Sequence, residues 1–126
     1  MNRQFNAKSL KAGSLPADRS LVTAAVAANG APTDPNQQMA TVGLFQTIDV
    51  VAKCAGAGAS YTFTVWWLDS TSGEWIADAT FNAVPVSTAG GVVDAVTNPY
   101  GATGIYIEVG NFAGGATANV WLTGRD

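Results

Sequence analysis

The sequence predicts an all-β protein built as an antiparallel β-sandwich and preceded by an extended N-terminal arm. Charged residues are only 12% of the chain, and Gly, Ala, Ser and Thr are abundant, a composition that suits closely spaced strands joined by tight turns. Apolar and polar residues alternate with a period of two in several segments, as in half-buried strands. At 126 residues the chain has the size of one domain, which we place at residues 21–126.

The first twenty residues are expected to form the arm. They show no sustained period of 2 or 3.6, and Gly13 and Pro16 interrupt them, so neither a strand nor a helix is favoured. Their net charge is +3, because four cations stand against the single acid Asp18, whereas residues 21–126 carry a net charge of −6. The four cations are Arg3, Lys8, Lys11 and Arg19. We therefore expect residues 1–20 to bind an acidic protein surface.

A first strand is predicted over residues 21–28, followed by a loop over residues 29–36 that is dense in turn residues and prolines. The apolar stretch has an alternative interpretation, as the apolar region and cleavage site of a secretory signal. Asp18 and Arg19 interrupt the approach to it, which favours the strand.

The clearest strand is predicted over residues 41–54. Most odd positions are polar, and six of the seven even positions are apolar: Val42, Leu44, Ile48, Val50, Ala52 and Cys54. Successive side chains of a strand point to opposite faces. We therefore expect this strand to be buried on one face and wet on the other.

Further strands follow at short, regular intervals. After the glycine-rich residues 55–59, the next core face is formed by Tyr61, Phe63, Val65 and Trp67. Residues 69–74 predict a hairpin turn in which Gly73 takes a positive φ, and the chain returns through Trp75, Ala77, Ala79 and Phe81. The set is completed by strands over residues 92–97, 104–112 and 118–123. Seven or eight short strands at this spacing indicate a sandwich, and we expect a jelly-roll-like order.

The residue inventory argues against catalysis. The chain contains no His and one cysteine, Cys54, which excludes His-dependent hydrolysis, an intrachain disulfide and a zinc cluster of Cys and His. Cys54 continues an apolar strand face and is expected to be an inert core residue. We therefore expect neither an enzyme nor a protein that holds a metal or a cofactor.

Paired carboxylates are the remaining route to hydrolysis, because two acids that face a cleft can cleave a glycosidic bond. The candidates are Asp69, Glu74 and Asp78. The first two lie in a predicted turn, where such residues form local hydrogen bonds, and Asp78 alternates away from the core. We interpret all three as solvated. A calcium site at Asp69 and Glu74 would lack the dense run of oxygen ligands that is usual for this ion.

Nucleic acid and membrane partners are not expected. The arm cations have no interleaved aromatic residues, and the rest of the chain is acidic. The glycine clusters at residues 101–104 and 110–115 do not follow a strand and open a helix, as phosphate-binding loops do. No stretch approaches the roughly 20 apolar residues of a membrane-spanning helix.

Three large aromatic residues lie out of phase with the core faces of their strands, and they are the interface or ligand candidates of the sequence: Trp66, Tyr106 and Trp121. Loops or the arm that fold over the outer face would cover them. Alternatively they form a subunit interface, since large apolar patches are seldom left in water. A third interpretation is a platform that stacks on sugars, with Asp49, Asp78 or Asn119 binding hydroxyls.

Several features occur together over the whole chain: an acid-free basic segment over residues 1–17, a Gly/Ala/Thr-rich sandwich, a Trp-rich hairpin over residues 66–75, and a C-terminal run from residues 104–109 to 120–124. In this combination the chain resembles small bacteriophage virion proteins. The class that it resembles most is the capsid decoration, or cement, proteins of tailed phages.

This resemblance implies a structural subunit on the virion surface, assembled in the host cytoplasm, that binds the major capsid protein at junctions of the shell. A homo-oligomer, a trimer or dimer, would bridge neighbouring capsid subunits. On this hypothesis the arm cations steer residues 1–20 along the shell, and the three out-of-phase aromatics bury against sister subunits. The alternative is a carbohydrate- or receptor-binding module of a phage tail or fibre.

Overall fold

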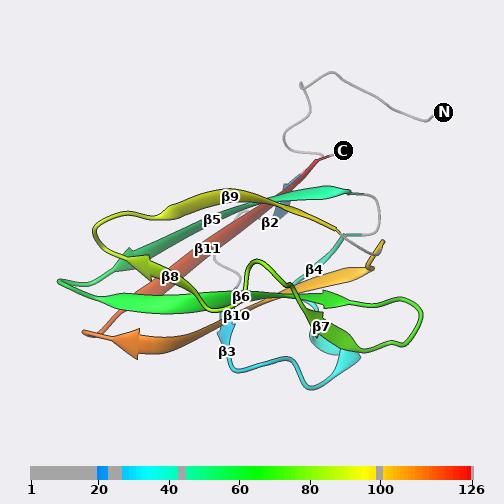
Figure 1. Ribbon diagram of the computed structural model, residues 1–126, viewed down its shortest axis with the longest axis horizontal. Coiled ribbons are helices and arrows are strands. Elements are labelled where there is room, and N and C mark those ends of the chain that lie inside the picture. Colours follow the sequence, from blue (N-terminus) through cyan, green and yellow to red (C-terminus); the bar gives the residue numbers. More distant parts are fainter. Residues whose placement is uncertain (1–19, 23–26, 43–44, 99–100, 126) are drawn as a thin grey trace.

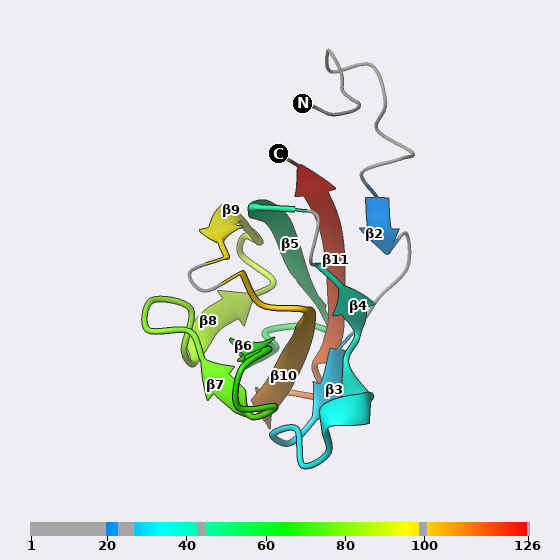
Figure 2. The ribbon, with the colours of Figure 1, turned by 90° about the vertical axis from the view of Figure 1, so that its right-hand side faces the viewer.

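The computed structural model describes residues 20–22, 27–42, 45–98 and 101–125. Within these ranges the chain forms two β-sheets that stack face to face (Figure 1, Figure 2). The predicted all-β sandwich is therefore confirmed. The predicted arm, with its four cations, lies outside the described residues, apart from Ser20 at its end. No helix in the described ranges is long and apolar enough to cross a membrane.

One sheet, called here the β5 sheet, contains four strands of the described chain. In spatial order they are β2 (Ser20–Val22), β11 (Thr117–Arg125), β5 (Thr47–Ala55) and β9 (Val92–Thr97). Strand β5 pairs with β11 over its whole length and with β9 along its other edge. The two long strands thus form the centre of this sheet.

The second sheet, called the β6 sheet, is centred on β6 (Ser60–Leu68) and β10 (Gly104–Ala113). The outer edge of β10 pairs with β3 (Ala27–Asn29) and β4 (Ala40–Thr41), and the outer edge of β6 pairs with β7 (Trp75–Ala77) and β8 (Val84–Ser87). A short 3-10 turn, η1 (Pro35–Gln37), lies between β3 and β4.

The strand pairing has the nested order of a jelly roll. Strand β2 pairs with β11, β4 with β10, β5 with β9, and β6 with β7 and β8, all antiparallel. This is one long hairpin rolled up so that the chain passes back and forth between two sheets. The expected jelly-roll-like order is confirmed. Strand β3 departs from it, because it runs parallel to β10.

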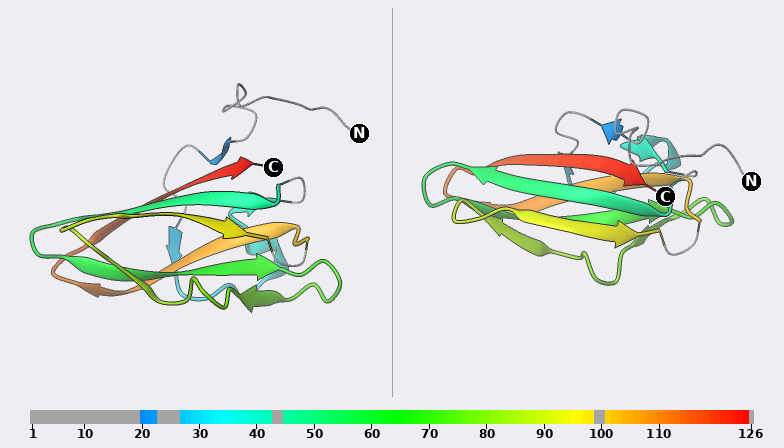
Figure 3. Two further views of the ribbon diagram at one scale, coloured as in Figure 1. Left: turned by 45° about the horizontal axis from the view of Figure 1, so that its top comes forward. Right: turned by 90° about the horizontal axis from the view of Figure 1, so that it is seen from above.

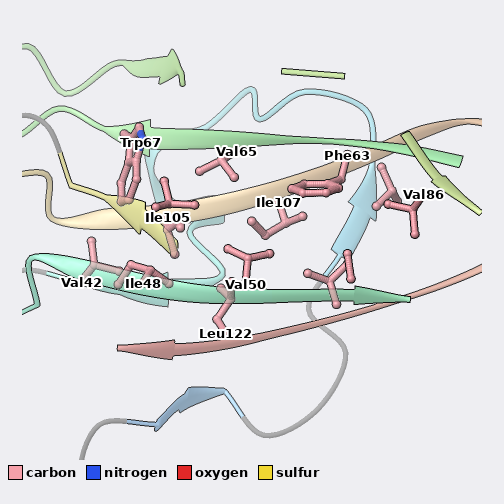
Figure 4. Packing of buried hydrophobic residues seen from close by; sticks show 14 of the residues in the cluster. Val42, Ile48, Val50, Phe63, Val65, Trp67, Val86, Ile105, Ile107 and Leu122 are labelled. Carbon is pink, nitrogen blue, oxygen red and sulfur yellow. The ribbon is translucent and has the colours of Figure 1, made fainter. Parts of the chain in front are cut away.

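The core lies between the sheets and follows the alternation in the sequence. Figure 4 shows Phe63, Val65 and Trp67 of β6 pointing across to Ile48 and Val50 of β5. The remaining fully buried members include Val42, Ala52, Tyr61, Val86, Val96, Ile105, Ile107, Val120 and Leu122. The predicted core face of residues 61–67 and the described part of that of residues 41–54 are thus confirmed, with Cys54 half-buried at the edge of the cluster. Leu44 lies outside the described residues.

Two predicted strands are each divided between the sheets. The segment predicted at residues 21–28 contributes to β2 and β3, and the one at residues 41–54 contributes to β4 and β5. At the second crossing the Phe45 amide donates to the Val42 carbonyl at 2.9 Å. Both sheets face one core, and the buried residues on either side of the crossing, Val42 and Ile48, both fall on even positions. Periodicity therefore hides the change of sheet.

The predicted hairpin is confirmed in its turn but not in its length. Gly73 has a φ of 72°, and its amide donates to the Asp69 carbonyl at 2.9 Å. The returning strand ends at Ala77 instead of Phe81, because Asp78 accepts hydrogen bonds from the next backbone amides and begins a loop. Strand β8, which the sequence did not predict, contains Pro85 and lies at a sheet edge, where proline is tolerated.

Tyr61 makes stability depend on pH above the neutral range. Its hydroxyl donates to the Lys53 carbonyl at 2.7 Å, and burial raises its pKa from 10.0 to about 12. Between pH 10 and 12 the unfolded chain loses this proton while the folded chain retains it. The stabilisation is therefore complete below pH 10 and falls as the pH rises.

We predict that the free energy of unfolding falls by on the order of 1–2 kcal/mol more in the wild type than in Tyr61→Phe across this range. Urea unfolding at stepped pH measures the difference between the slopes. Burial also raises the pKa of Tyr106, and this contribution remains in the variant. Equal slopes in the two proteins would contradict the assignment to Tyr61.

Candidate functional site

The outer face of the β6 sheet contains a polar pocket of about 270 Å³, called here the β6-face pocket. Its walls include Thr62, Thr64, Asn82, Ala83, Glu108 and Asn111. The strand register brings the strand residues together, because Thr64 lies opposite Glu108 and Thr62 lies opposite Gly110. Side chains directly opposite on one face are about 5 Å apart. The floor of the pocket is thus a regular part of the sheet.

Trp66 adjoins this pocket. It lies two residues along β6 from Thr64, on the same face, and its indole Nε1 donates to Glu108 Oε1 at 2.8 Å. The indole is half-buried. The hydrogen bond fixes the Trp66 ring beside the carboxylate, so that an aromatic surface and a hydroxyl-binding group are held next to one another.

Tyr106 lies directly opposite Trp66 but is covered by the chain itself. Only 3% of the residue is exposed. The Trp75 ring lies over it, with ring centroids 5.9 Å apart, and its hydroxyl donates to the Gly30 carbonyl at 3.3 Å. Burial and then the Glu108 charge raise its pKa. Of the three interpretations of the out-of-phase aromatics, the one in which a segment of the same chain covers the outer face matches the surroundings of Tyr106.

The covering segment is held by its own capped turn. Asp34 accepts from the Asn36 amide at 2.8 Å, and the Gln37 side chain accepts from the Asp34 amide at 2.7 Å, which is a capping box. The Trp75 indole donates to the Asp34 carbonyl at 2.9 Å. This network joins η1 to β7, so that both lie beside Tyr106.

The loop that forms one wall of the pocket is organised by Asp78. Its Oδ1 accepts from the indole of Trp67 at 2.9 Å, and its Oδ2 accepts from the amides of Thr80 and Phe81 at 3.0 and 2.9 Å. The sequence interpretation of Asp78 as solvated was wrong, because its carboxylate satisfies a buried indole. Further along, the Ala83 amide donates to Thr64 Oγ1 at 2.9 Å. These bonds place Asn82 and Ala83 at the pocket.

Backbone strain is concentrated at the same pocket. In the described parts of the chain the non-glycine residues with positive φ are Ala83 and Asn111, both at 53°. Each contributes to the pocket wall. Asn tolerates this region, whereas for Ala it costs about 1–2 kcal/mol. Strained non-glycine residues persist where the surrounding structure holds them, and they cluster at functional sites.

The outer face of the β5 sheet has a different character. Val93, Val51 and Trp121 lie opposite one another across β9, β5 and β11, and Figure 3 shows these strands side by side. We call these three residues the apolar row. Val93 is 76% exposed, and the other two are half-buried. Trp121 is therefore on the opposite sheet from Trp66 and Tyr106, and the three aromatics do not form one platform.

The other candidates have local structural roles. The Asp69 carboxylate accepts from the Ser72 hydroxyl and amide at 2.7 and 2.9 Å, and these bonds lower the pKa of Asp69. This agrees with its interpretation as a turn residue. In register, Asp49 lies opposite Thr123, and Asn119 lies opposite Lys53, both pairs on the β5 sheet. No group of three or more His, Cys, Asp or Glu side chains in the described ranges is placed to hold a metal.

Sequence reasoning missed the pocket. Thr62, Thr64 and Glu108 were visible as polar residues on outward phases, but the register that joins β6 to β10 is a long-range property. Asn111 falls within the strand predicted over residues 104–112, and Asn82 follows the last residue, Phe81, of the predicted returning strand. The one local signal was Glu108, the only charged residue in the segment 104–112.

A second hollow of about 380 Å³ lies at the edge where β3, β10 and β11 meet. Most of its wall residues are apolar, and Ala28, Val109, Phe112 and Ala116 are among them. Asn29 and Thr117 supply its polar side chains. It therefore offers less specific hydrogen bonding than the β6-face pocket.

We predict that Asp78→Ala lowers the free energy of unfolding by about 2–4 kcal/mol, because it leaves the Trp67 indole without an acceptor and releases two loop amides. Trp67 is 0% exposed. Urea denaturation followed by tryptophan fluorescence measures the loss. The matched control is Asp94→Ala, since this exposed carboxylate accepts, among the described residues, from the amide of its neighbour Ala95 alone. The control should stay within about 0.5 kcal/mol of wild type; a similar small change in Asp78→Ala would contradict the role of Asp78.

Comparison of this chain with family models, with curated proteins and with solved structures finds no match. Two surfaces on opposite sheets are therefore the candidate functional sites: the polar β6-face pocket and the apolar row of the β5 sheet.

Proposed function

We propose that the chain is a virion structural protein, a capsid decoration subunit that binds the major capsid shell and associates with sister copies. The observation that carries this proposal is the apolar row. The exposed Val93 lies beside Val51 and Trp121, and contiguous apolar surface of this kind marks sites where another protein binds. Tryptophan flanked by aliphatic groups is typical of the buried centre of a protein interface.

The distribution of charge supports the same proposal. Residues 1–20 carry a net charge of +3, and residues 21–126 carry −6. The basic segment ends at Ser20, which pairs with Thr123 in the β5 sheet, two residues from Trp121. A shell with an acidic surface would attract the basic segment and repel the acidic body. The subunit would then bind with residues 1–20 on the shell and with its apolar row available to sister subunits.

We expect the full chain to form a stable dimer or trimer, and Val93→Asp to shift it towards monomer. A charge in the apolar row would have to lose its water on association, which is unfavourable. Light scattering over a concentration series gives the mass of each species. Val93→Thr keeps the shape of the side chain and should weaken association less, and Thr88→Asp places the same charge in an exposed turn and should leave it unchanged. A wild-type chain that is monomeric at every concentration contradicts this part of the proposal.

Binding to the shell is tested separately. We expect replacement of Arg3, Lys8, Lys11 and Arg19 by Ser to reduce binding to the shell about tenfold or more at low salt, and to remove most of its salt dependence. Co-sedimentation with phage particles assembled without this chain measures the binding. The folded sandwich serves as an internal control, because its unfolding midpoint should not change. Undiminished binding by the variant would show that the basic segment is not the attachment element.

A further inference from the structure

We propose that the β6-face pocket binds a neutral saccharide, with Trp66 as the flanking aromatic surface. This inference is independent of the proposed role in a virion, because the pocket and the apolar row lie on opposite outer faces of the sandwich.

The chemistry of the pocket wall favours a ligand with hydroxyl groups. Two Thr hydroxyls, two Asn amides and one Glu carboxylate supply donors and acceptors at short spacing. The pocket wall includes no Lys or Arg among the described residues. A phosphate, sulfate or carboxylate ligand would thus meet Glu108 without a compensating cation. Uncharged hydroxyls can donate to the carboxylate and accept from the amides.

Part of the hydrogen-bonding capacity of these groups is unused within the described chain. Glu108 accepts from Trp66 through Oε1, which leaves its second oxygen as an acceptor. Asn111 donates through Nδ2 to Thr62 Oγ1 at 3.0 Å, which leaves its carbonyl oxygen. Asn82 is exposed at the rim. Three residues from two segments, strand β10 and the loop before β8, thus supply available polar atoms to one hollow.

The arrangement is also preorganised. Glu108 is held by Trp66, Asn111 by Thr62, and the backbone of Ala83 by Thr64. The positive φ of Ala83 and Asn111 is maintained against its steric cost. Rigid polar groups lose little entropy when a ligand binds. The volume of about 270 Å³ lies just below the range of drug-sized ligand pockets, about 300–1,000 Å³. We therefore expect one sugar ring to enter the pocket and a second ring to lie towards Trp66.

The test is a titration of the isotope-labelled full chain with neutral oligosaccharides based on glucose, galactose, mannose and N-acetylhexosamines, observed by NMR. We expect the Trp66 indole N–H and the amides of residues 82–83 and 108–111 to shift together for at least one series. Methyl glycosides of the same sugars distinguish recognition of a single ring from recognition of a chain. Sialylated and sulfated glycans should bind more weakly than their neutral counterparts, because the Glu108 carboxylate repels their negative charge.

Two variants test the assignment without threatening the fold. Asn111→Gly removes the amide at a position where glycine readily adopts the backbone conformation, and Asn82→Ala changes an exposed residue. Each should weaken binding about tenfold, which is equivalent to 1.4 kcal/mol. Val93→Asp, on the other sheet, should bind as the wild type does, so that failure of the virion proposal and failure of this one are separable.

The proposal is overturned if no neutral saccharide in the panel shifts these resonances at millimolar concentration, or if the shifts fall outside the pocket. It is also overturned if both variants bind with the wild-type affinity, or if anionic glycans bind more tightly than neutral ones.

Discussion

The hydrogen bond between Trp67 and Asp78 connects the core of this protein to its outer surface. The Trp67 ring lies in the core between the sheets, where an indole N–H without an acceptor would be costly. Asp78 meets that requirement at 2.9 Å and uses its second oxygen to hold the amides of Thr80 and Phe81. The loop therefore lies against β6, and Ala83 reaches the hydroxyl of Thr64. Packing in the core thus determines the shape of a pocket on the opposite face of the same strand.

The two outer faces differ because different lengths of chain cross them. On the β6 sheet, the segment around η1 covers Tyr106, and the loop from Asp78 to Ala83 follows β6, so that a hollow remains between covered regions. On the β5 sheet, Val93 is mostly exposed. A face that is partly covered by its own loops favours a small ligand, whereas an open face with an apolar centre favours another protein. Trp66 and Tyr106 lie on the partly covered face of the β6 sheet, and Trp121 lies on the more open face of the β5 sheet.

The sequence predicted those features that depend on near neighbours. Alternation placed Tyr61, Phe63, Val65 and Trp67 in the core, and the turn chemistry of Gly73 placed a hairpin. Features that depend on distant partners could not be predicted. The crossing near Val42 preserves the phase of burial, Tyr106 is covered by a segment about seventy residues earlier in the chain, and the pocket needs β6 and β10 in one register. Asp78 was misjudged because its phase indicated solvent, while its partner, an indole in the core, becomes a neighbour only after folding.

The edges of the sandwich explain why association between copies is expected at a face. An exposed edge strand can pair with another chain, and proteins usually block such pairing with charge or proline. Asp94 of β9 lies opposite the core residue Val50, yet Asp94 itself is exposed. A strand from another chain that paired with β9 would have to accommodate this charge. Strand β8 carries the exposed Pro85, which removes one backbone donor. Edge pairing is thus disfavoured at both strands, which favours the apolar row over these two edges as the surface through which copies would associate.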